Sequence, residues 1–262
     1  DNQKLEAQIT NVLTDGEEII HLEYSNAGQG YTGDATDIYT FTGNGFGAAA
    51  SSGNVTDDAI FELRIRNPDD GSTVDDDGEV DSFGGRGYNT STNTAQSGDS
   101  TSITLSNTET AAAGDYVGMR VVIVSGTGVG QYGRITTYNA NTKVANVAKE
   151  SDGTAGWDTF HHSNAVETSL DATTTYIIEP RVTVTGGGGT GAIIRAKVAD
   201  GRITEFRIVN PGSGYTSAPT VTITDPSVTV DVVFDVRIGD GVLGQPTFSN
   251  RGTGFVTASA EV

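Results

Sequence analysis

A repeat of about 40 residues constrains this chain more than any other feature of its sequence. The segments KVADGRITEFRIVNPGSGYT, from Lys197, and RIGDGVLGQPTFSNRGTGFV, from Arg237, match without a gap. Both contain Asp-Gly, then Asn, then a Gly-x-Gly element followed by an aromatic residue, each in the same place. Repeats of this length are typical of chains built from stacked supersecondary units. The sequence therefore predicts small repeated units rather than one large core.

Two further segments carry the same signature. The N-terminal segment NVLTDGEEIIHLEYSNAGQGYT contains it with one inserted residue, and the alignment matches Leu13 with Val198. The segment DDDGEVDSFGGRGYNT, which begins at Asp75, is a weaker copy whose second strand is shorter. Across the four copies the glycine–aromatic element occupies Gly28, Gly30 and Tyr31; Gly85, Gly87 and Tyr88; Gly212, Gly214 and Tyr215; and Gly252, Gly254 and Phe255.

Each unit reads as a β-hairpin followed by a further strand. Residues alternate in character from Ala192 to Val198, which is the period of a half-buried strand. Asp200–Gly201 predicts a two-residue hairpin turn, because such turns need positive φ. The return strand places Phe206 and Ile208 on one face. Ile203 is out of phase with them and predicts a β-bulge near the turn.

The glycine–tyrosine element that follows the return strand resembles both a ligand loop and a structural turn. A ligand loop is usually built once, whereas this element recurs in the repeats, so we interpret it as a turn. Gly212 and Gly214 supply backbone angles that other residues resist, and Tyr215 is expected to pin the turn onto its own sheet. The change Gly214→Val is expected to impair folding or assembly. Val221 to Ile223 then alternates as the third strand of the unit.

The composition of the chain argues against several classes of binding partner and covalent chemistry. The net charge of −19 disfavours nucleic acid and anionic membranes, since both require clustered Lys and Arg. Cysteine is absent, which excludes disulfides and thiol nucleophiles. No run of apolar residues reaches membrane-spanning length, so no membrane insertion is expected. Since the sequence opens and closes inside repeat units, we expect the array to continue in a longer parent protein.

The repeat stops in the middle of the chain, where a different small β-domain is predicted over 97–180. Its strands are expected at Met119 to Val124, Tyr132 to Tyr138, Lys143 to Val147 and Tyr176 to Ile178, separated by glycine- and asparagine-rich turns.

The predicted fold class is therefore all-β. Two repeat modules, 1–96 and 181–262, flank a small barrel- or sandwich-like β-domain in an elongated, fibre-like arrangement.

Two motifs resemble virion structural proteins of tailed bacteriophages, especially tail-fibre and baseplate proteins of T4-like cyanophages. One is GxGYTxxPTVTI, present at Gly212 to Ile223. The other is GMRVVIVSGTGVGQYGRITTYNANTKVANV, from Gly118 to Val147, followed by Trp157 and by TTTYII at Thr173 to Ile178. Together the two modules cover most of the chain.

The resemblance implies a non-enzymatic component of a virion appendage, such as a tail fibre or baseplate. It implies localisation in the virion, assembly as a homotrimer, contacts with other virion proteins and a part in host attachment. The alternative is an extracellular adhesin module, viral or bacterial, that binds a receptor or a host-surface glycan. A polysaccharide depolymerase is a third hypothesis, because phage tailspikes place carboxylate pairs on β-scaffolds.

Two glycine-rich stretches invite comparison with phosphate-binding loops: GGGGTG at Gly186 to Gly191 and SGTGVGQ at Ser125 to Gln131. Phosphate loops require a following helix, whose N-terminus supplies amide donors and a favourable dipole. Alternating strand residues follow both stretches here, so turns in β-modules are predicted instead.

Metal binding has two candidate locations. The acidic stretch NPDDGSTVDDDGEVDSF, from Asn67 to Phe83, does not fit the EF-hand pattern, which leaves irregular Ca²⁺ binding or a solvated acidic loop. The pair His161–His162 is better read as a surface loop, because adjacent side chains on a strand point to opposite faces. His21 stands alone, and no other cofactor is expected. The carboxylates proposed for Ca²⁺ are Asp75, Asp76, Asp77 and Asp81.

Overall fold

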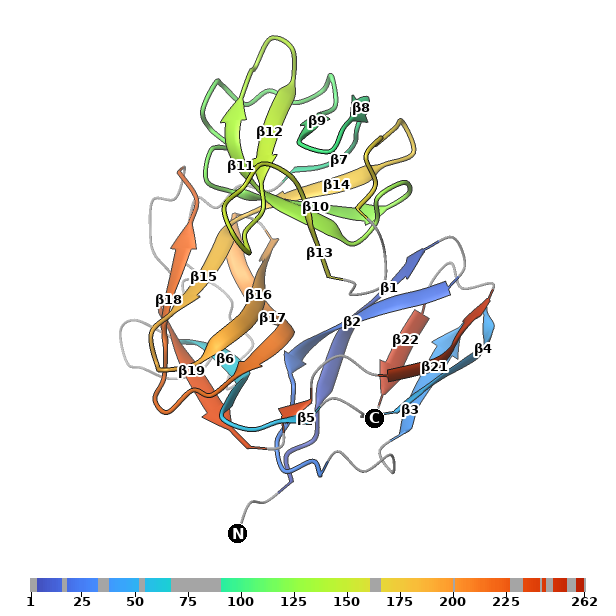
Figure 1. The fold of residues 1–262 in the computed structure, drawn as a ribbon, viewed down its shortest axis with the longest axis vertical. Helices are drawn as coiled ribbons and strands as arrows, with labels where there is room; N and C mark the ends of the chain where they lie inside the picture. The colour runs from blue at the N-terminus through green and yellow to red at the C-terminus, as the bar shows by residue number, and fades with distance from the viewer. Residues whose placement is uncertain are drawn as a thin grey trace. The chain divides into compact units, whose positions relative to one another are not determined.

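The computed structural model describes residues 4–15, 18–32, 38–51, 55–66, 91–160, 166–199, 201–226, 233–240, 242–243, 247–253 and 258–261. These residues contain strands, turns and no helix, so the fold is all-β as predicted (Figure 1). The chain divides into two compact units. The first comprises Asp1–Arg86, Val182–Thr222 and Val230–Val262, and the second comprises Gly87–Arg181 and Ile223–Thr229.

The flanking repeat segments, expected as two modules, belong to one unit. This first unit contains β1 (Gln8–Asp15), β2 (Glu18–Asn26), β3 (Ile38–Gly43), β4 (Phe46–Ser51), β5 (Val55–Thr56), β6 (Ala59–Arg66), β15 (Arg181–Thr185), β16 (Thr190–Ala199), β17 (Arg202–Ser213), β18 (Thr220–Thr224), β19 (Val233–Gly239), β20 (Val242–Leu243), β21 (Thr247–Thr253) and β22 (Ala258–Glu261).

Strands β16 and β17 form the hairpin that the sequence predicts. Ala199 pairs with Arg202, so two residues separate the strands. The register shifts between Lys197 and Val198, which pair with Glu205 and Ile203. The predicted bulge near the turn is therefore present.

Strands β1 and β2 form the same hairpin in the N-terminal copy. Ile9 pairs with Tyr24 and Leu13 pairs with His21, and the register slips between Ile9 and Asn11. Thr10 is therefore the inserted residue. The predicted match of Leu13 with Val198 is wrong by one position, because a bulge absorbs the insertion inside the strand rather than at the turn.

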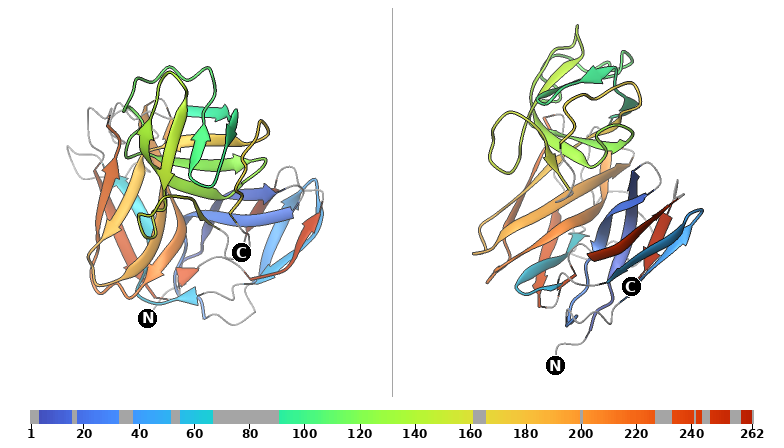
Figure 2. Two further views of the ribbon diagram at one scale, coloured as in Figure 1. Left: turned by 45° about the horizontal axis from the view of Figure 1, so that its top comes forward. Right: turned by 45° about the vertical axis from the view of Figure 1, so that its right-hand side comes forward.

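The third strand of the unit does not extend the hairpin at β17. The sheet order is β18-β15-β16-β17-β2-β6-β19, so β18 lies beside β15, on the far side of the hairpin (Figure 2). The free edge of β17 pairs instead with β2, and Ile208 lies opposite Tyr24. Matching residues of two repeats thus meet at this edge.

A further repeat copy, missed from the sequence, occupies β4, β5 and β6. The segment DDAIFELRIRNP from Asp57 matches DGRITEFRIVNP from Asp200. It precedes the weaker copy proposed at Asp75, and that weaker copy lies outside the described residues.

This copy and the C-terminal copy exchange strands. Strand β4 pairs with β21, β5 with β20 and β6 with β19, all antiparallel. Figure 1 shows the blue β3 and β4 beside the red β21 and β22. We call these pairs the two exchanged hairpins. The first consists of β4–β21 continued by β5–β20, and the second consists of β6–β19. We call β16–β17 the closed hairpin.

The exchanged hairpins keep the register of the closed one at its central pair. Ile194 pairs with Ile208 in the closed hairpin. The matching positions pair as Ala50 with Phe248 and as Phe234 with Ile65. The four-stranded sheet β21-β4-β3-β22 repeats the order β17-β16-β15-β18, although its strands come from two distant parts of the chain.

The second unit contains the inserted domain, which begins at Gly87 where the sequence predicted residue 97. Its sheet order is β7-β14-β10-β11-β12-β9-β8, with β13 beside β11. The four predicted strands are present, and their apolar side chains form a core with Trp157. The strands are β7 (Ser91–Thr94), β8 (Ser97–Gly98), β9 (Ser102–Thr104), β10 (Arg120–Ser125), β11 (Gln131–Tyr138), β12 (Val144–Ala148), β13 (Asp158–Thr159) and β14 (Thr175–Glu179).

Candidate functional site

The glycine–tyrosine turns have one geometry in the two copies where they are described. Gly28 and Gly212 have φ of 67° and 68°. The Asn two residues earlier accepts a hydrogen bond from each glycine N–H, at 2.7 Å for Asn26 and 2.9 Å for Asn210. The signature asparagine thus closes an Asx turn that orients the glycine.

The tyrosine of each turn bonds back to the first strand of its own hairpin. The Tyr31 hydroxyl accepts a hydrogen bond from the Ala7 N–H at 2.9 Å. The Tyr215 hydroxyl accepts one from the backbone of Ala192, the residue that matches Ala7. Both rings are buried, so each tyrosine fastens its turn to its own hairpin.

Close packing explains the first glycine of each turn. A Cβ on Gly212 would lie 2.6 Å from the Thr190 carbonyl oxygen and 2.9 Å from the Tyr215 ring. The second glycine, Gly214, has φ of 74°, but a Cβ on it would meet only the Gly189 Cα, at 3.9 Å. Gly212 is therefore required by both backbone angle and space, whereas Gly214 is required by backbone angle alone.

The same turns join neighbouring repeats. The Tyr215 N–H donates to the Asp58 carbonyl oxygen at 2.7 Å, and the Gly30 N–H donates to the Asp240 carbonyl oxygen at 2.8 Å. Asp58 and Asp240 lie where the chain crosses between the two exchanged hairpins. We call this arrangement the repeat joint, defined by Gly30, Tyr215, Asp58 and Asp240.

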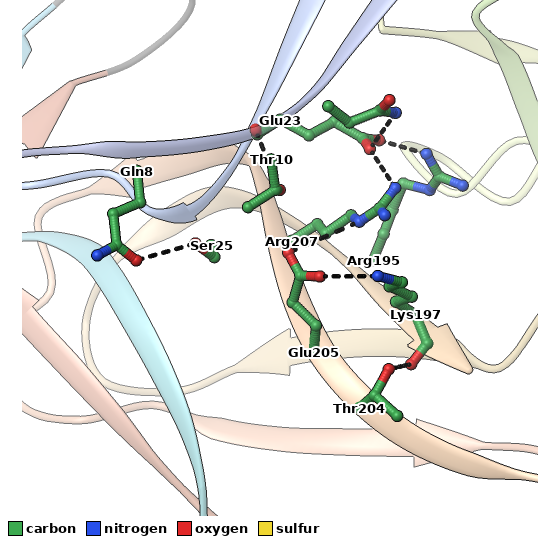
Figure 3. Close-up of polar contacts among 10 residues, drawn as sticks. Gln8, Thr10, Glu23, Ser25, Arg195, Lys197, Thr204, Glu205 and Arg207 are labelled. Atoms are coloured by element: carbon green, nitrogen blue, oxygen red, sulfur yellow. Dashed lines mark hydrogen bonds and ion pairs between the residues drawn. The ribbon is translucent and has the colours of Figure 1, made fainter. Parts of the chain in front are cut away.

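A buried ion cluster joins the hairpin β1–β2 to the closed hairpin (Figure 3). Arg195 on β16 lies directly opposite Arg207 on β17. Two like charges in such a cross-strand pair destabilise the sheet unless a counter-charge is near. Both bond to Glu23 of β2, which is fully buried; the Arg207 Nη1 to Glu23 Oε2 distance is 3.1 Å. Asn11 Nδ2 donates to the same oxygen at 2.8 Å.

The cluster holds Glu23 as a carboxylate. Burial favours the neutral acid, but the charges of Arg195, His21 and Arg207 together outweigh it and lower the Glu23 pKa to about 2. His21 is itself buried at 1% exposure, two residues from Glu23 on β2. No local sequence pattern marks this cluster, because Glu23 and Arg195 are 172 residues apart in the chain.

The stretch SGTGVGQ is a turn whose amide groups bond within the second unit. The N–H groups of Val129, Gly130 and Gln131 donate to carbonyl oxygens of Gly126, Ile123 and Gly128. These donors are therefore engaged by the protein itself, as the turn interpretation predicts.

The stretch GGGGTG packs against the glycine–tyrosine turn of the closed hairpin. A Cβ on Gly189 would lie 2.5 Å from the Tyr215 ring, and one on Gly187 would lie 2.6 Å from the Ser217 carbonyl oxygen. The Gly187 carbonyl oxygen accepts a hydrogen bond from the Thr216 N–H at 2.8 Å. Its glycines allow two chain segments to approach closely.

The second unit contains a buried carboxylate, Glu109, at 5% exposure. Burial acts to raise its pKa, but hydrogen bonds from Ser91, Tyr116 and Tyr176 outweigh burial and lower the pKa. The ionised carboxylate therefore joins the segment that carries Glu109 to strands β7 and β14. Its donors are Ser91 Oγ, Asn93 Nδ2, Tyr116 Oη and Tyr176 Oη.

Aromatic side chains do not form an exposed platform in the described part of the chain. Trp157 is 1% exposed, and its Nε1 donates to the Asp99 carbonyl oxygen at 2.9 Å. The only large hydrophobic side chain among the described residues that is exposed is Val117. A hollow of about 460 Å³ lies on the β11–β12 hairpin, lined by Thr137, Tyr138, Asn139, Thr142, Val144 and Asn146.

Most of the remaining predicted site residues are not among those that the structure describes. Asp75, Asp76, Asp77, Asp81, Gly85, Gly87, Tyr88, Gly254, Phe255, His161 and His162 lie outside the described residues; Gly252 lies within β21. Within the described ranges, no group of three or more His, Asp or Glu side chains could hold a metal ion. Those same ranges contain no helix with the length and apolarity of a membrane span.

No protein-family model, no curated protein and no solved structure matches this chain.

Proposed function

We propose that this chain is a structural, non-enzymatic module of a tailed-phage virion appendage, such as a tail fibre or baseplate. The repeat joint is the observation that carries the proposal. The recurring glycine–tyrosine turns donate their N–H groups to Asp58 and Asp240 of neighbouring repeats, at 2.7 and 2.8 Å. A sequence element repeated for this purpose builds an array rather than a single reactive site.

The buried ion cluster between the hairpins β1–β2 and β16–β17 supports the same proposal. Glu23, in a fully buried position, forms ion pairs with two arginines of another repeat. Breaking a buried ion pair is costly, so the cluster fixes one relative placement of β1–β2 and β16–β17. Rigid placement of successive hairpins is what a load-transmitting appendage requires.

In this proposal the chain resides in the virion, associates with copies of itself as a homotrimer and docks to other virion proteins. Mass spectrometry and immunogold electron microscopy of purified virions of the phage that encodes the chain test its location. The chain should be present in stoichiometric amounts, with label on the tail or its appendages. Virions that lack it would overturn the proposal.

Glycan binding is the second candidate, and the hollow on β11–β12 is the observation in its favour. Its rim offers amide and hydroxyl groups of Asn139, Thr142 and Asn146, which suit sugar hydroxyls. A glycan array tests it: hits abolished by Asn146→Ala would support an adhesin, and an array without hits would contradict it.

A further inference from the structure

The exchanged hairpins show that the pairing of repeat strands does not depend on which repeat supplies each strand. Lys197 pairs with Glu205 in the closed hairpin. At the matching positions Arg237 pairs with Glu62, and the bulge falls at the next residue in both hairpins. The register is therefore a property of the strands themselves, independent of the turn that connects them.

Specific side-chain contacts accompany the exchanged pairing. Arg237 Nη1 lies 2.7 Å from Glu62 Oε2, and the Arg237 guanidinium lies 4.9 Å from the centre of the Phe61 ring. A Cβ on Gly239 would lie 2.4 Å from Gln29 Oε1, so β19 also fits closely against the N-terminal hairpin. Strand β19 is thus recognised by surfaces distant from it in sequence.

The two kinds of hairpin differ in whether a tight turn joins the paired strands. In the closed hairpin, Gly201 with φ of 74° turns the chain straight back. In the exchanged pair, Asp58 keeps a positive φ of 49°, yet the chain continues into a strand whose partner is 175 residues away. The paired strands β6 and β19 are therefore not joined to each other by a tight turn.

We propose that a second copy of this chain can supply β19–β22 in trans, so that copies are linked through swapped C-terminal strands. Each copy would then complete β3–β6 of the next copy, around a ring of three, with the same strand pairs that now form within one chain. Exchange of an identical element is a low-cost route to association, because it creates no contact that the single chain lacks. Because both forms have the same strand pairs, raising the concentration of chains relative to the effective concentration of the strands within one chain favours the linked form.

The proposal deepens the self-association part of the proposed function, and it is argued from the strand register and the contacts of β19. Its test detects covalent linkage between copies in vitro, whereas the virion assignment is tested on phage particles. Either can therefore fail without the other.

The absence of native cysteine gives a direct test. The double variant Glu62→Cys/Arg237→Cys places one cysteine on each of two paired residues. It is refolded from denaturant under oxidising conditions, from about 1 μM to about 1 mM, the upper value approaching the effective concentration of a short tether. Non-reducing gels and mass spectrometry then separate chains linked internally from chains linked to each other.

We expect internal linkage at the lowest concentration and a rise of at least tenfold in disulfide-linked dimers and trimers at the highest. The matched control is Lys197→Cys/Glu205→Cys, the same position in the closed hairpin. The control should stay internally linked at every concentration. The proposal is overturned if the first variant forms no disulfide, if it stays wholly internal at the highest concentration, or if the control dimerises equally.

Discussion

The closed hairpin β16–β17 and the exchanged hairpins use one register but opposite connectivity. In the first, two residues join the paired strands; in the second, paired strands such as β4 and β21 lie at opposite ends of the chain. Each exchanged hairpin has the central pair of the closed hairpin and one of its two register shifts, at Arg237/Ile238 in β6–β19 and at Phe248/Asn250 in β4–β21. The comparison teaches that strand sequence specifies the pairing here, while the turn determines only which strand is nearest.

The two regions also differ in how they are held by their neighbours. The closed hairpin has two opposed arginines that depend on Glu23 from β2. The exchanged hairpin β6–β19 has the pair Glu62–Arg237, in which 41% of the arginine side chain is exposed. Perturbing each region separately should therefore give effects of different size.

The largest effect is expected from Glu23→Gln. The change removes the buried carboxylate to which both Arg195 and Arg207 bond, while Glu205 still lies 3.9 Å from Arg207. Breaking a buried ion cluster in this way costs about 3 to 5 kcal/mol of unfolding free energy. Chemical denaturation measures it. The matched control Glu62→Gln, in the exchanged hairpin, should cost less than about 1 kcal/mol. Equal costs would contradict the difference drawn between the two regions.

The same cluster predicts a pH dependence. The Glu23 pKa is lowered in the folded state from 4.5 to about 2, so its contribution is complete above pH 4.5 and is lost as pH falls toward 2. This shift corresponds to about 3 kcal/mol. The difference in unfolding free energy between the wild type and Glu23→Gln should shrink over that interval. A difference independent of pH would contradict an ionised Glu23.

Substitution of the turn glycines comes next. Gly212→Ala combines a left-handed residue with overpacking against Thr190 and Tyr215, so it should cost about 3 kcal/mol. Gly214→Ala has only the backbone cost, about 1 to 2 kcal/mol. Thermal unfolding of both variants checks the order. Gly214→Val should cost more unfolding free energy than Gly214→Ala, because valine is β-branched. A melting temperature unchanged by Gly214→Val would contradict the role of the turn.

The smallest effect is expected from Tyr215→Phe. The change removes the acceptor of the Ala192 N–H but keeps the ring, so it should cost about 1 kcal/mol. Tyr31→Phe is the matched variant in the N-terminal copy and should behave alike, since its hydroxyl bonds to Ala7. A much larger loss for one of the two would show that the copies are not equivalent.

Local features of the fold could be predicted from the sequence. Alternation identified β16 and β17, and the phase of Ile203 identified the bulge, because both depend on neighbouring residues. Partner choice could not be predicted, because β4 and β21 carry the same pattern as strands that close on their own turn. Aligning Asp57 with Asp200 would have revealed the missed copy, since DDAIFELRIRNP and DGRITEFRIVNP share seven identical positions.

Some residues of the candidate site could likewise be predicted from the local sequence, and others could not. The repeated glycines and Tyr215 indicated a turn, and close contacts within the hairpin explain them. The partners of that turn, Asp58 and Asp240, come from other repeats and had no local signal. Glu23 was likewise unpredictable, because its charge partners lie on strands that only the folded chain brings near.

Inter-strand NMR contacts in the dilute monomer test the strand exchange most directly. Four backbone positions suffice: Ala50, Ile65, Phe234 and Phe248. The exchanged arrangement predicts cross-strand contacts between Ala50 and Phe248 and between Ile65 and Phe234. Contacts between Ala50 and Ile65 and between Phe234 and Phe248 would instead show two closed hairpins and would contradict the account.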